Sequence, residues 1–289
     1  MGEKTAISWC DHSWNPWQGC HKVSAGCANC YMYSEKIRYG QRPNEVVRSK
    51  PPTFNAPLSK KWAEPARVFT CSWSDFFIEE ADAWRADAWD IIRRTPHLTY
   101  QILTKRPERI AAALPADWGA GWPNVWLGVS VENQEAAFKR LPPLIEAPAT
   151  ARFVSAEPLL GPVDLSPWLI ADLGARGRAR IGLLHWVIVG GESGDRARPC
   201  DVAWIRELVD QCCHADVAVF VKQLGAVPVM TEAAWRAARP TPLLSASVGK
   251  RGRTPAGLEV LAQTDPKGGE PAEWPADLRM QQFPEVTRG

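Results

Sequence analysis

Short apolar runs recur along the chain and alternate with longer stretches that carry apolar residues every three or four positions. The runs predict buried strands, and the stretches between them predict helices with one apolar face. Alternating residues at 5–9 predict a further short strand near the start. The predicted strands are Thr5–Trp9, Val68–Ser72, Thr99–Leu103, Val125–Val129, Arg152–Ser155, Trp186–Val189 and Val217–Val221.

Helices are predicted in the stretches between these strands. After the second strand, one apolar stripe runs at steps of four and three residues through Phe77, Ala81, Trp84, Ala88 and Ile91. Further helices are predicted at 28–39 closed by Gly40, at 107–114 with Pro107 in the first turn, up to about 145, and at 203–214 behind a cap at Asp201. Alternating strands and helices form a parallel sheet covered by helices. We therefore expect an α/β protein, a complete or partial parallel (β/α) barrel of six to seven strands.

The regular alternation ends near residue 224. Residues 1–224 are predicted to form the (β/α) barrel. Residues 225–289 contain more Pro, Gly and charge, and predict an irregular C-terminal extension packed on the barrel through Trp274 and Leu278. Residues 41–66 carry five prolines and predict a long connection.

The composition is that of a soluble globular protein, with 45% hydrophobic and 23% charged residues. No apolar run is long enough to span a bilayer and no signal peptide is visible, so we expect a cytoplasmic protein without a membrane partner. A net charge of +2 is too small to indicate a polyanionic partner. We interpret two local basic clusters as solvated surface: Arg176, Arg178 and Arg180, and Lys250, Arg251 and Arg253.

Three cysteines lie in one short segment near the start of the chain. Cys20, Cys27 and Cys30 are separated by six and two residues, in a stretch of turn-forming residues just before a predicted helix. Several thiolates on one loop are typical of a metal site. A structural zinc needs four ligands, whereas a four-iron cluster held by three cysteines leaves one iron open for a substrate or cofactor.

Other interpretations of the three cysteines stay open. They could pack in the core, although a loop of turn formers is a poor place for buried thiols. A zinc site could be completed by His12, His21 or Cys10, which are all nearby. A disulfide framework requires an oxidising compartment, for which the sequence gives no indication.

Polar side chains follow nearly every predicted strand. The carboxyl ends of parallel strands form the working face of a barrel, so these side chains are candidates for one site. Each also has a structural alternative, such as a helix cap for Asp75, a solvated turn for Lys105 and an ion pair for Glu157. The residues are Ser72, Ser74, Asp75, Thr104, Lys105, Arg106, Ser130, Glu132, Asn133, Glu157, Glu192, Ser193, Lys222 and Gln223.

Several motifs together resemble a known family. They are Trp14-Asn15-Pro16, Gly19-Cys20, Gly26-Cys27-Ala28-Asn29-Cys30-Tyr31, Leu103-Thr104-Lys105-Arg106-Pro107, Gly128-Val129-Ser130-Val131-Glu132-Asn133, Glu157-Pro158-Leu159-Leu160-Gly161, Gly190-Gly191-Glu192-Ser193-Gly194 and Trp274-Pro275-Ala276-Asp277-Leu278-Arg279. Across nearly its whole length the chain resembles the phage-encoded and prophage-encoded three-cysteine-motif proteins of undefined function in the radical S-adenosylmethionine superfamily.

The resemblance implies a 4Fe-4S cluster on Cys20, Cys27 and Cys30, with S-adenosylmethionine (SAM) on the open iron. In the superfamily, one electron from the cluster cleaves the sulfonium and yields a 5'-deoxyadenosyl radical that abstracts hydrogen from a substrate. The chain is thus expected to be a radical SAM enzyme, with a reductant protein such as flavodoxin or ferredoxin as partner. The phage association makes nucleic acid or a nucleotide the first candidate substrate. The competing expectation is a zinc-stabilised phage protein that binds nucleic acid without catalysis.

The chain departs from the superfamily pattern in two ways that affect residue roles. Six residues rather than three separate its first two cysteines, and Asn29 replaces the usual aromatic residue before the third cysteine, with Tyr31 following instead. Its Gly-Gly-Glu likewise lies at 190–192 instead of after the second strand. Ser72, Ser74 and Asp75 are therefore predicted to accept the methionyl ammonium group. The further candidates for cofactor binding are Ser130, Glu132, Asn133 and Glu192.

The candidates for catalytic residues are Cys71, Lys105 and Glu157. The related spore photoproduct lyases, which act on DNA, use a cysteine in a place comparable to Cys71 as a hydrogen-atom donor. The structural alternative for Cys71 is a buried strand cysteine without a chemical role.

Overall fold

The structure is a computed structural model that describes residues 5–172, 180–230, 259–260 and 263–286. Most of the two basic clusters lies outside these residues, namely Arg176, Arg178, Lys250, Arg251 and Arg253. Within the described part, no helix combines the length and the apolar character that crossing a bilayer requires.

The described strands are β1 (His12–Trp14), β2 (Trp17–Gln18), β3 (Val47–Arg48), β4 (Ala66–Thr70), β5 (Leu98–Thr104), β6 (Val125–Ser130), β7 (Ala151–Ala156), β8 (Ile170–Asp172), β9 (Arg180–Gly182), β10 (Trp186–Gly190), β11 (Cys200–Asp201), β12 (Ala218–Gln223), β13 (Pro228–Met230) and β14 (Glu259–Val260). The α-helices are α1 (Tyr31–Arg38), α2 (Pro51–Phe54), α3 (Asp82–Arg94), α4 (Ile110–Ala113), α5 (Gln134–Glu146), α6 (Ser166–Leu169) and α7 (Val202–Ala215). Short 3-10 helices are η1 (Ala25–Cys27), η2 (Ala56–Leu58), η3 (Lys60–Trp62), η4 (Glu79–Ala81), η5 (Pro107–Arg109), η6 (Pro271–Glu273) and η7 (Ala276–Leu278).

Seven strands form one sheet in the order β1-β4-β5-β6-β7-β10-β12. The pairs β1–β4, β4–β5, β5–β6 and β10–β12 all run parallel. Each strand of this sheet is added beside the preceding one, which is the order of a parallel barrel. In the described residues β1 and β12 are the two edges, so the sheet is open. The predicted α/β class is thus confirmed, in the partial form of the barrel.

Contacts divide the chain into two compact units, which are described separately below. The first unit contains residues 1–130, 138–154 and 285–289, and the second contains 131–137 and 155–284. The domain boundary predicted at residue 224 does not coincide with this division and stays a prediction.

In the first unit, the initial strand lies further along the chain than the alternation predicts. Residues 5–9 form no strand, and His12–Trp14 pair with β4 instead. Asp11 determines this register, because its backbone N–H donates to Arg67 O (2.9 Å) and its Oδ2 accepts from Arg67 N (2.8 Å). Trp9 is buried by packing on Phe69, with ring centroids 4.6 Å apart. The alternation at 5–9 therefore reflects half-buried Thr5 and Ile7 and buried Trp9 without strand pairing.

Helix α3 follows β4 as predicted, but it begins at Asp82, and residues 76–78 are buried in the loop before it. Ala88 and Ile92 face the core, whereas Trp84 is only half-buried. Arg85 is buried on this helix because its Nε donates to Phe76 O (3.0 Å) and its Nη2 to Ile78 O (2.6 Å). A buried arginine that satisfies loop carbonyls is not visible in an apolar pattern.

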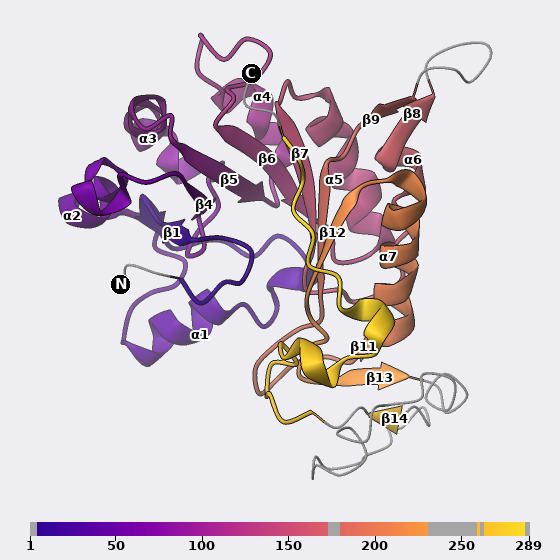
Figure 1. The fold of residues 1–289 in the computed structure, drawn as a ribbon. Helices are drawn as coiled ribbons and strands as arrows, with labels where there is room; N and C mark the ends of the chain where they lie inside the picture. Colours follow the sequence, from indigo (N-terminus) through magenta and orange to yellow (C-terminus); the bar gives the residue numbers. More distant parts are fainter. Residues whose placement is uncertain (1–4, 173–179, 231–258, 261–262, 287–289) are drawn as a thin grey trace. The chain divides into compact units, whose positions relative to one another are not determined.

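A glycine in the middle of β6 allows a large aromatic ring to pack on the sheet. A Cβ at Gly128 would lie 2.4–2.6 Å from ring carbons of Phe153, which is 1% exposed. Figure 1 shows β4, β5 and β6 side by side in this unit. The ring of Phe153 therefore occupies the space that a side chain at 128 would need.

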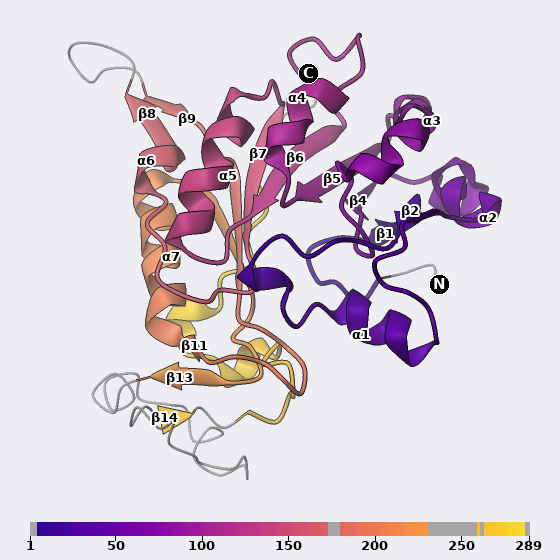
Figure 2. The same cartoon turned by 180° about the vertical axis from the view of Figure 1, so that it is seen from behind.

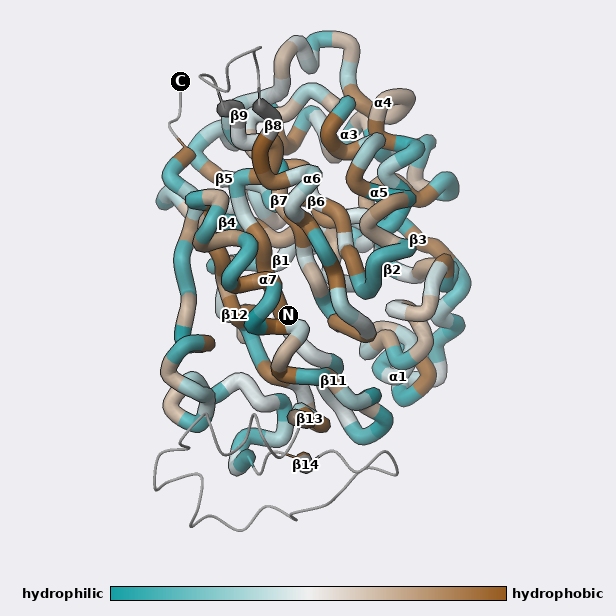
Figure 3. The backbone as a smooth tube through the Cα atoms, turned by 90° about the vertical axis from the view of Figure 1, so that its right-hand side faces the viewer, coloured by the Kyte–Doolittle hydropathy of each residue, from teal (hydrophilic) through white to brown (hydrophobic). Residues whose placement is uncertain are grey.

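The second unit contains β10, β12 and the helix between them. Asp201 caps α7, as predicted, by accepting from Ala203 N (2.9 Å). Apolar and polar residues alternate along α7 (Figure 3), and its buried residues include Ile205, Leu208 and Cys212. The short helix α6 contacts both α7 and β8, which pairs with β9 in a hairpin (Figure 2).

The C-terminal segment lies along β12 in this unit. Met280 O accepts from Val221 N (2.7 Å) and Gln282 N donates to Val219 O (2.9 Å). Trp274 and Leu278 are each 1% exposed, as the predicted packing of this segment requires. The irregular character predicted for the C-terminal region is confirmed, although it also contains β13, which pairs with β11 and β14.

Replacement of Gly128 by Ala should lower the free energy of unfolding by about 1–3 kcal/mol, because the added methyl group overlaps the Phe153 ring. Urea denaturation measures this change. Gly161→Ala is the matched control, since the nearest atom to its added Cβ lies at 3.8 Å. Equal stability of the two variants would contradict this account of the core.

Candidate functional site

The path of the cysteine loop depends on Gly19, which directly precedes Cys20. Gly19 has φ +95°, and a Cβ there would lie 2.1 Å from Glu45 O. Its N–H donates to Trp73 O (3.0 Å), and its carbonyl accepts from Ser74 Oγ (2.5 Å). Only glycine combines this conformation with so close a backbone approach. The segment after β4 thus holds the start of the loop.

Asparagine 15 makes a second connection between the loop and the end of β4. Its Nδ2 donates to Ser72 Oγ (2.9 Å), and its Oδ1 accepts from Trp73 N (2.7 Å) and from Ser72 Oγ (3.2 Å). Asn15 is 1% exposed, so these bonds satisfy a buried amide. Ser72 and Ser74, predicted to accept an ammonium group, both hold the loop in the described structure, and the predicted role stays a prediction.

The carboxylate of Asp75 accepts four hydrogen bonds at the ends of β4 and β5. Phe77 N (2.9 Å) and Thr104 Oγ1 (2.7 Å) donate to Oδ1, whereas Lys105 N (2.9 Å) and Arg106 Nη1 (3.1 Å) lie at Oδ2. We call these five residues the Asp75 network. Asp75 is 5% exposed, so the carboxylate is stabilised almost entirely by protein donors. Its predicted contact with an ammonium group stays a prediction, and any such contact would be additional to these four.

The guanidinium of Arg106 joins the Asp75 network to the cysteine loop. Its Nη2 donates to His21 O (2.9 Å), and its Nη1 lies 3.7 Å from Cys20 Sγ. Burial lowers the pKa of Arg106, but Asp75 and then Cys20 outweigh burial and raise it above its ordinary value. Burial, followed by repulsion from Asp75, raises the pKa of the Cys20 thiol to about 11, although Arg106 acts in the opposite direction. Arg106 is thus a fixed positive charge beside this sulfur.

Tyr33 lies where all three cysteines of the loop act on it. Its hydroxyl lies 2.5 Å from Cys20 O and 2.6 Å from Asn44 Oδ1. Burial raises the pKa of this hydroxyl, and repulsion from Cys20, Cys30 and Cys27 adds to the increase. Cys30 is the N-cap of α1 and Cys27 ends η1, so two short helical elements position these thiols. Tyr33 thus connects two of the predicted ligands through their backbone, because its hydroxyl lies at Cys20 O and its N–H donates to Cys30 O (3.1 Å).

The three thiols do not form a ligand set for a single ion. Among the described residues, no group of three or more His, Cys, Asp or Glu side chains is arranged to hold a metal ion. In a four-iron cluster each cysteine binds a different iron, so its sulfurs stand further apart than ligands that share one ion. The chemistry of three free, partly exposed thiols on one loop fits such a cluster.

The candidates for a fourth zinc ligand have other contacts. His21 Nε2 lies 2.5 Å from Glu80 Oε1. The ring of His12 stacks on Trp62, with centroids 4.3 Å apart. Cys10 Sγ lies 3.8 Å from Ile7 O. The zinc site and the cluster both stay hypotheses for the loop.

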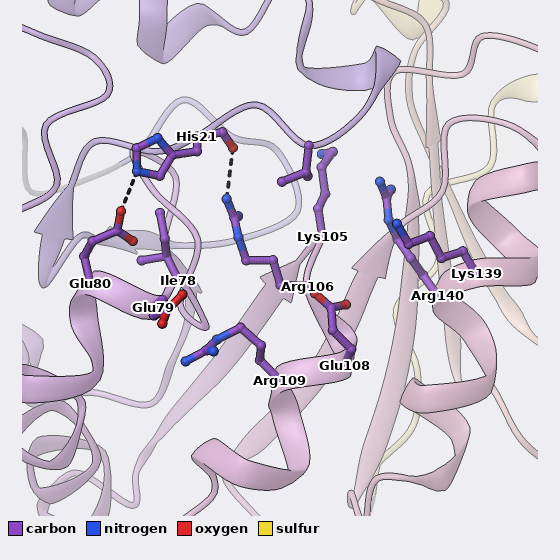
Figure 4. Close-up of a pocket in the computed structure, with 11 residues that line it drawn as sticks. His21, Ile78, Glu79, Glu80, Lys105, Arg106, Glu108, Arg109, Lys139 and Arg140 are labelled. Carbon is purple, nitrogen blue, oxygen red and sulfur yellow. Dashed lines mark hydrogen bonds and ion pairs between the residues drawn. The ribbon is translucent and has the colours of Figure 1, made fainter.

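A cavity of about 260 Å³ opens beside the loop in the first unit. Lys105 and Arg106 extend into it from the end of β5, and Lys139 and Arg140 reach it from α5 (Figure 4). Lys105 Nζ donates to Ser130 Oγ (2.9 Å), which places two predicted site residues together. The remaining wall consists of His21, Val23, Ile78, Glu79, Glu80, Glu108 and Arg109.

Cys71 directly follows β4 and is 3% exposed. Burial, then repulsion from Asp75 and Cys20, raises the pKa of its thiol well above the ordinary value. Cys71 directly precedes Ser72, whose carbonyl accepts from the Tyr31 hydroxyl (2.5 Å), so it lies near the cysteine loop. A hydrogen-atom donor must be a protonated thiol, so this environment is compatible with the predicted role, which stays a prediction.

In the second unit, predicted residues form ion pairs at the strand ends. Lys222 Nζ lies 3.0 Å from Glu157 Oε1, and Ser155 Oγ donates to Glu157 Oε2 (3.3 Å). Glu192 is 6% exposed and accepts from Arg198 through Nη2 (2.6 Å) and Nε (2.8 Å). These contacts gather the strand-end charges of this unit but do not test the predicted catalytic and cofactor-binding roles.

The glycines of the Gly-Gly-Glu motif allow close approach of other groups. A Cβ at Gly190 would lie 2.7 Å from Glu157 Oε1, and one at Gly191 would lie 2.3 Å from Leu224 O. Asn133 caps α5, because its Oδ1 accepts from Ala136 N (2.9 Å). Glu132 is 1% exposed and contributes to the raised pKa of Arg198, for which the bond to Glu192 is the largest cause.

Sequence reasoning missed Tyr33, Lys139, Arg140 and Arg198 as members of these groups. None of them directly follows a strand, and each reaches its site from a helix or a loop. Only Arg140 could have been found from the sequence. It is a charged residue on the face of a predicted helix that the apolar pattern assigns to the core, and such residues are rarely buried without a specific partner.

Comparison with protein families gives one match. The model of a family described as a protein of unknown function, DUF5131, matches residues 4–260. The chain belongs to this family. Comparisons of this DUF5131 protein with curated proteins and with solved structures find no match.

Replacement of Arg106 by Ala should lower the free energy of unfolding by about 3 kcal/mol, because it leaves the buried Asp75 carboxylate without its cationic partner. Urea denaturation measures the change. Arg94→Ala is the control, since Arg94 and its partner Asp90 are both exposed. A loss no larger in Arg106→Ala than in Arg94→Ala would contradict the role of the Asp75 network.

Proposed function

We propose that this DUF5131 protein is a radical SAM enzyme. Cys20, Cys27 and Cys30 would hold a 4Fe-4S cluster, and S-adenosylmethionine would bind beside it. When bound and reduced, the cluster would supply the electron that breaks the C5'–S bond of S-adenosylmethionine, giving methionine and the 5'-deoxyadenosyl radical. The observation that carries the proposal is a loop with three free cysteines, held by the bonds of Tyr33 to Cys20 O and Cys30 O, with the buried guanidinium of Arg106 3.7 Å from the Cys20 sulfur.

The chain's own residues have definite tasks under this proposal. Gly19, Asn15 and Ser74 fix the loop against the segment after β4, so the thiols are positioned before any metal binds. Arg106 places a hydrogen-bond donor at Cys20 Sγ, and donors at cluster sulfurs are a principal means of adjusting a reduction potential. Burial of the surrounding indole and phenyl rings, such as Trp17 and Phe76, excludes water from the region behind the loop.

The proposal also requires a proton to leave Cys20 when it becomes a ligand. The Cys20 thiol has a pKa of about 11, so it is protonated at neutral pH without a metal. Metal ligation needs the thiolate, and binding therefore releases this proton. The adjacent guanidinium of Arg106 stabilises the resulting negative charge.

The competing function is a zinc-stabilised protein that binds nucleic acid without catalysis. Metal analysis after anaerobic purification separates the two hypotheses. One zinc ion per chain and no visible absorption would support the competitor.

Replacement of Cys27 by Ala should abolish the cluster. After anaerobic reconstitution with iron and sulfide, the native chain should carry four irons per chain, as the proposed 4Fe-4S cluster requires. It should give the absorption and electron paramagnetic resonance signals of such a cluster, and release 5'-deoxyadenosine from S-adenosylmethionine under a strong reductant. Cys27→Ala should lose the iron and the product.

Cys213→Ala is the matched control for the cysteine change, because Cys213 is an exposed thiol of α7, outside the loop. It should keep full iron loading and turnover. Full iron loading in Cys27→Ala would contradict the ligand assignment. An iron-loaded native chain that never cleaves S-adenosylmethionine would contradict the enzymatic proposal.

A further inference from the structure

We propose that helix α1 and the turn after it dock an acidic electron-transfer protein, which delivers the electron that the proposed chemistry requires. This inference rests on the proposed function and deepens it by naming where the partner binds. The evidence is a cluster of exposed apolar side chains with an excess of positive charge, next to the predicted ligands and wholly within the first unit.

Exposed apolar side chains are concentrated around the cysteine loop. In the described part of the chain eight large apolar residues are exposed, and five of them lie between positions 23 and 47. Three of the five belong to α1 and its C-cap, namely Tyr31, Ile37 and Tyr39, which are 53%, 64% and 65% exposed. Single exposed apolar residues are ordinary on a protein surface, whereas a cluster of them marks an interaction site.

Helix α1 is covered on one side only. Its buried residues are Met32 and Lys36, which are four positions apart and therefore lie on the same face. Tyr31, Ile37 and Arg38 lie outside that face and are exposed. The helix lies at the edge of the first unit in both views of the ribbon (Figures 1 and 2). Most of its surface is thus free to meet a partner.

The exposed cluster belongs to a positively charged segment. Residues 20–48 contain five Lys or Arg residues and two Glu residues, a formal net charge of +3 with His21 neutral. One acid, Glu35, lies 3.8 Å from Arg38. The other, Glu45, acts on Lys36, whose pKa is lowered by burial and raised by this carboxylate. Both acids of the segment are therefore already offset against cations within it.

Two cations of the segment have no carboxylate beside them. Lys22 Nζ donates to Ala28 O (2.7 Å) and lies 4.7 Å from the centroid of the Tyr33 ring, and these contacts leave its charge in place. Arg42 is exposed just after α1. Among the described residues, no Asp or Glu lies within ion-pairing distance of Lys22 or Arg42. A modest positive charge therefore remains near both ends of the helix.

A hollow of about 470 Å³ follows the end of α1 and is bounded by residues 41–45. Gln41 N donates to Lys36 O (2.8 Å), so the hollow adjoins the last turn of the helix. Pockets of this kind receive the anchoring side chains of protein partners. We call the exposed residues around it the α1 surface, which consists of Lys22, Tyr31, Ile37, Arg38, Tyr39 and Arg42.

The α1 surface adjoins two of the predicted cluster ligands. Cys30 is the N-cap of α1, and the hydroxyl of Tyr33 on this helix lies 2.5 Å from Cys20 O. The eight residues of α1 span roughly 12 Å at about 1.5 Å per residue. A protein seated on this helix is therefore close to the thiols, as an electron donor to them must be.

The composition of the α1 surface selects among possible occupants. Few apolar side chains beside several cations suit a small, transient interface, and electron-transfer complexes bury the least area among specific complexes. A positive surface speeds association with an acidic partner. A second copy of the chain would bring the same positive charges to a two-fold interface. The aliphatic side chain of Ile37 offers no ring on which a nucleic-acid base could stack.

The direct test measures binding to the full-length chain prepared without iron. Isothermal titration calorimetry at low ionic strength compares a flavodoxin and a ferredoxin, both of net negative charge, with a cytochrome c of net positive charge. At least one acidic protein should bind and the basic one should not. Binding should weaken as salt is added, because exposed charges are screened.

Ile37→Ser should weaken binding of the acidic donor roughly tenfold, the effect of losing one apolar side chain that the partner buries. Phe138→Ser is the matched control, since Phe138 is 63% exposed on α5, outside the α1 surface. Arg42→Gln should lower the association rate and reduce the salt dependence. Its control is Lys60→Gln, an exposed lysine of η3. The melting temperature should stay unchanged in Ile37→Ser and Arg42→Gln, because both side chains are exposed.

The iron-loaded chain gives a second readout. Stopped-flow absorption measures the rate of reduction by the reduced flavodoxin, below saturation, and by dithionite, which is too small to need a docking surface. The ratio of the two rates should fall roughly tenfold in Ile37→Ser and stay unchanged in Phe138→Ser. An equal ratio in these two variants would overturn the proposal.

The other occupants give different results. Fluorescence anisotropy with a labelled single-stranded oligonucleotide tests nucleic acid, and analytical ultracentrifugation of the chain alone tests a second copy. Oligonucleotide binding that weakens in Ile37→Ser, or a dimer that this variant dissociates, would assign the α1 surface to that occupant and overturn the proposal. So would the absence of saturable binding of both acidic donors.

Failure of the proposed function has a separate signature. Binding of the acidic donor by a native chain that acquires no iron would support the docking surface and contradict the radical SAM enzyme. Iron loading and cleavage of S-adenosylmethionine under dithionite, without binding of either acidic donor, would contradict the docking surface alone.

Discussion

The buried carboxylate of Asp75 is the interaction on which the candidate site depends. It accepts donors from the segment after β4 and from the end of β5, including the guanidinium of Arg106. Burying a carboxylate is costly unless charged and hydrogen-bonding partners surround it. Four donors meet that requirement here. The same bonds position the backbone of Lys105 and the guanidinium of Arg106. They therefore also position the cavity wall and the positive charge beside Cys20.

Arg106 connects two features that are far apart in the sequence. Cys20 and Arg106 are separated by 86 positions, yet Arg106 Nη1 lies 3.7 Å from the Cys20 sulfur. Parallel topology explains this proximity, because the carboxyl ends of β4 and β5 lie at the same edge and the cysteine loop is tied to that edge through Asn15 and Ser74. Arg106 therefore both places a positive charge beside Cys20 and forms part of the cavity wall.

The second unit has its own set of strand-end charges. Half-buried Glu157 forms an ion pair with Lys222, and buried Glu192 forms one with Arg198. Gly190 and Gly191 allow these groups and the backbone after β12 to approach closely. The Gly-Gly-Glu motif thus has a structural explanation within this unit that does not depend on any cofactor.

Much of the fold could be predicted from periodicity, because burial of alternate or successive apolar residues is a local property of the chain. Six strands of the main sheet lie where the apolar runs indicate, and Asp201 caps α7 as its residue type suggests. The first strand was misplaced, because burial of Trp9 by Phe69 imitates strand alternation without pairing. The apolar stripe predicted for α3 was partly wrong. Arg85 is buried on this helix, because its guanidinium donates to the carbonyls of Phe76 and Ile78 in the preceding loop.

The sequence by itself determined the α/β class, the cysteine loop and the rule that polar residues follow the strands, since these depend on neighbours in the chain. Only the tertiary structure decided which of those polar residues meet. It joined Asp75 to Arg106 and Lys105 to Ser130, and it brought Tyr33, Lys139 and Arg140 into the groups. Contacts between side chains on different elements depend on register and helix rotation, which local periodicity does not specify.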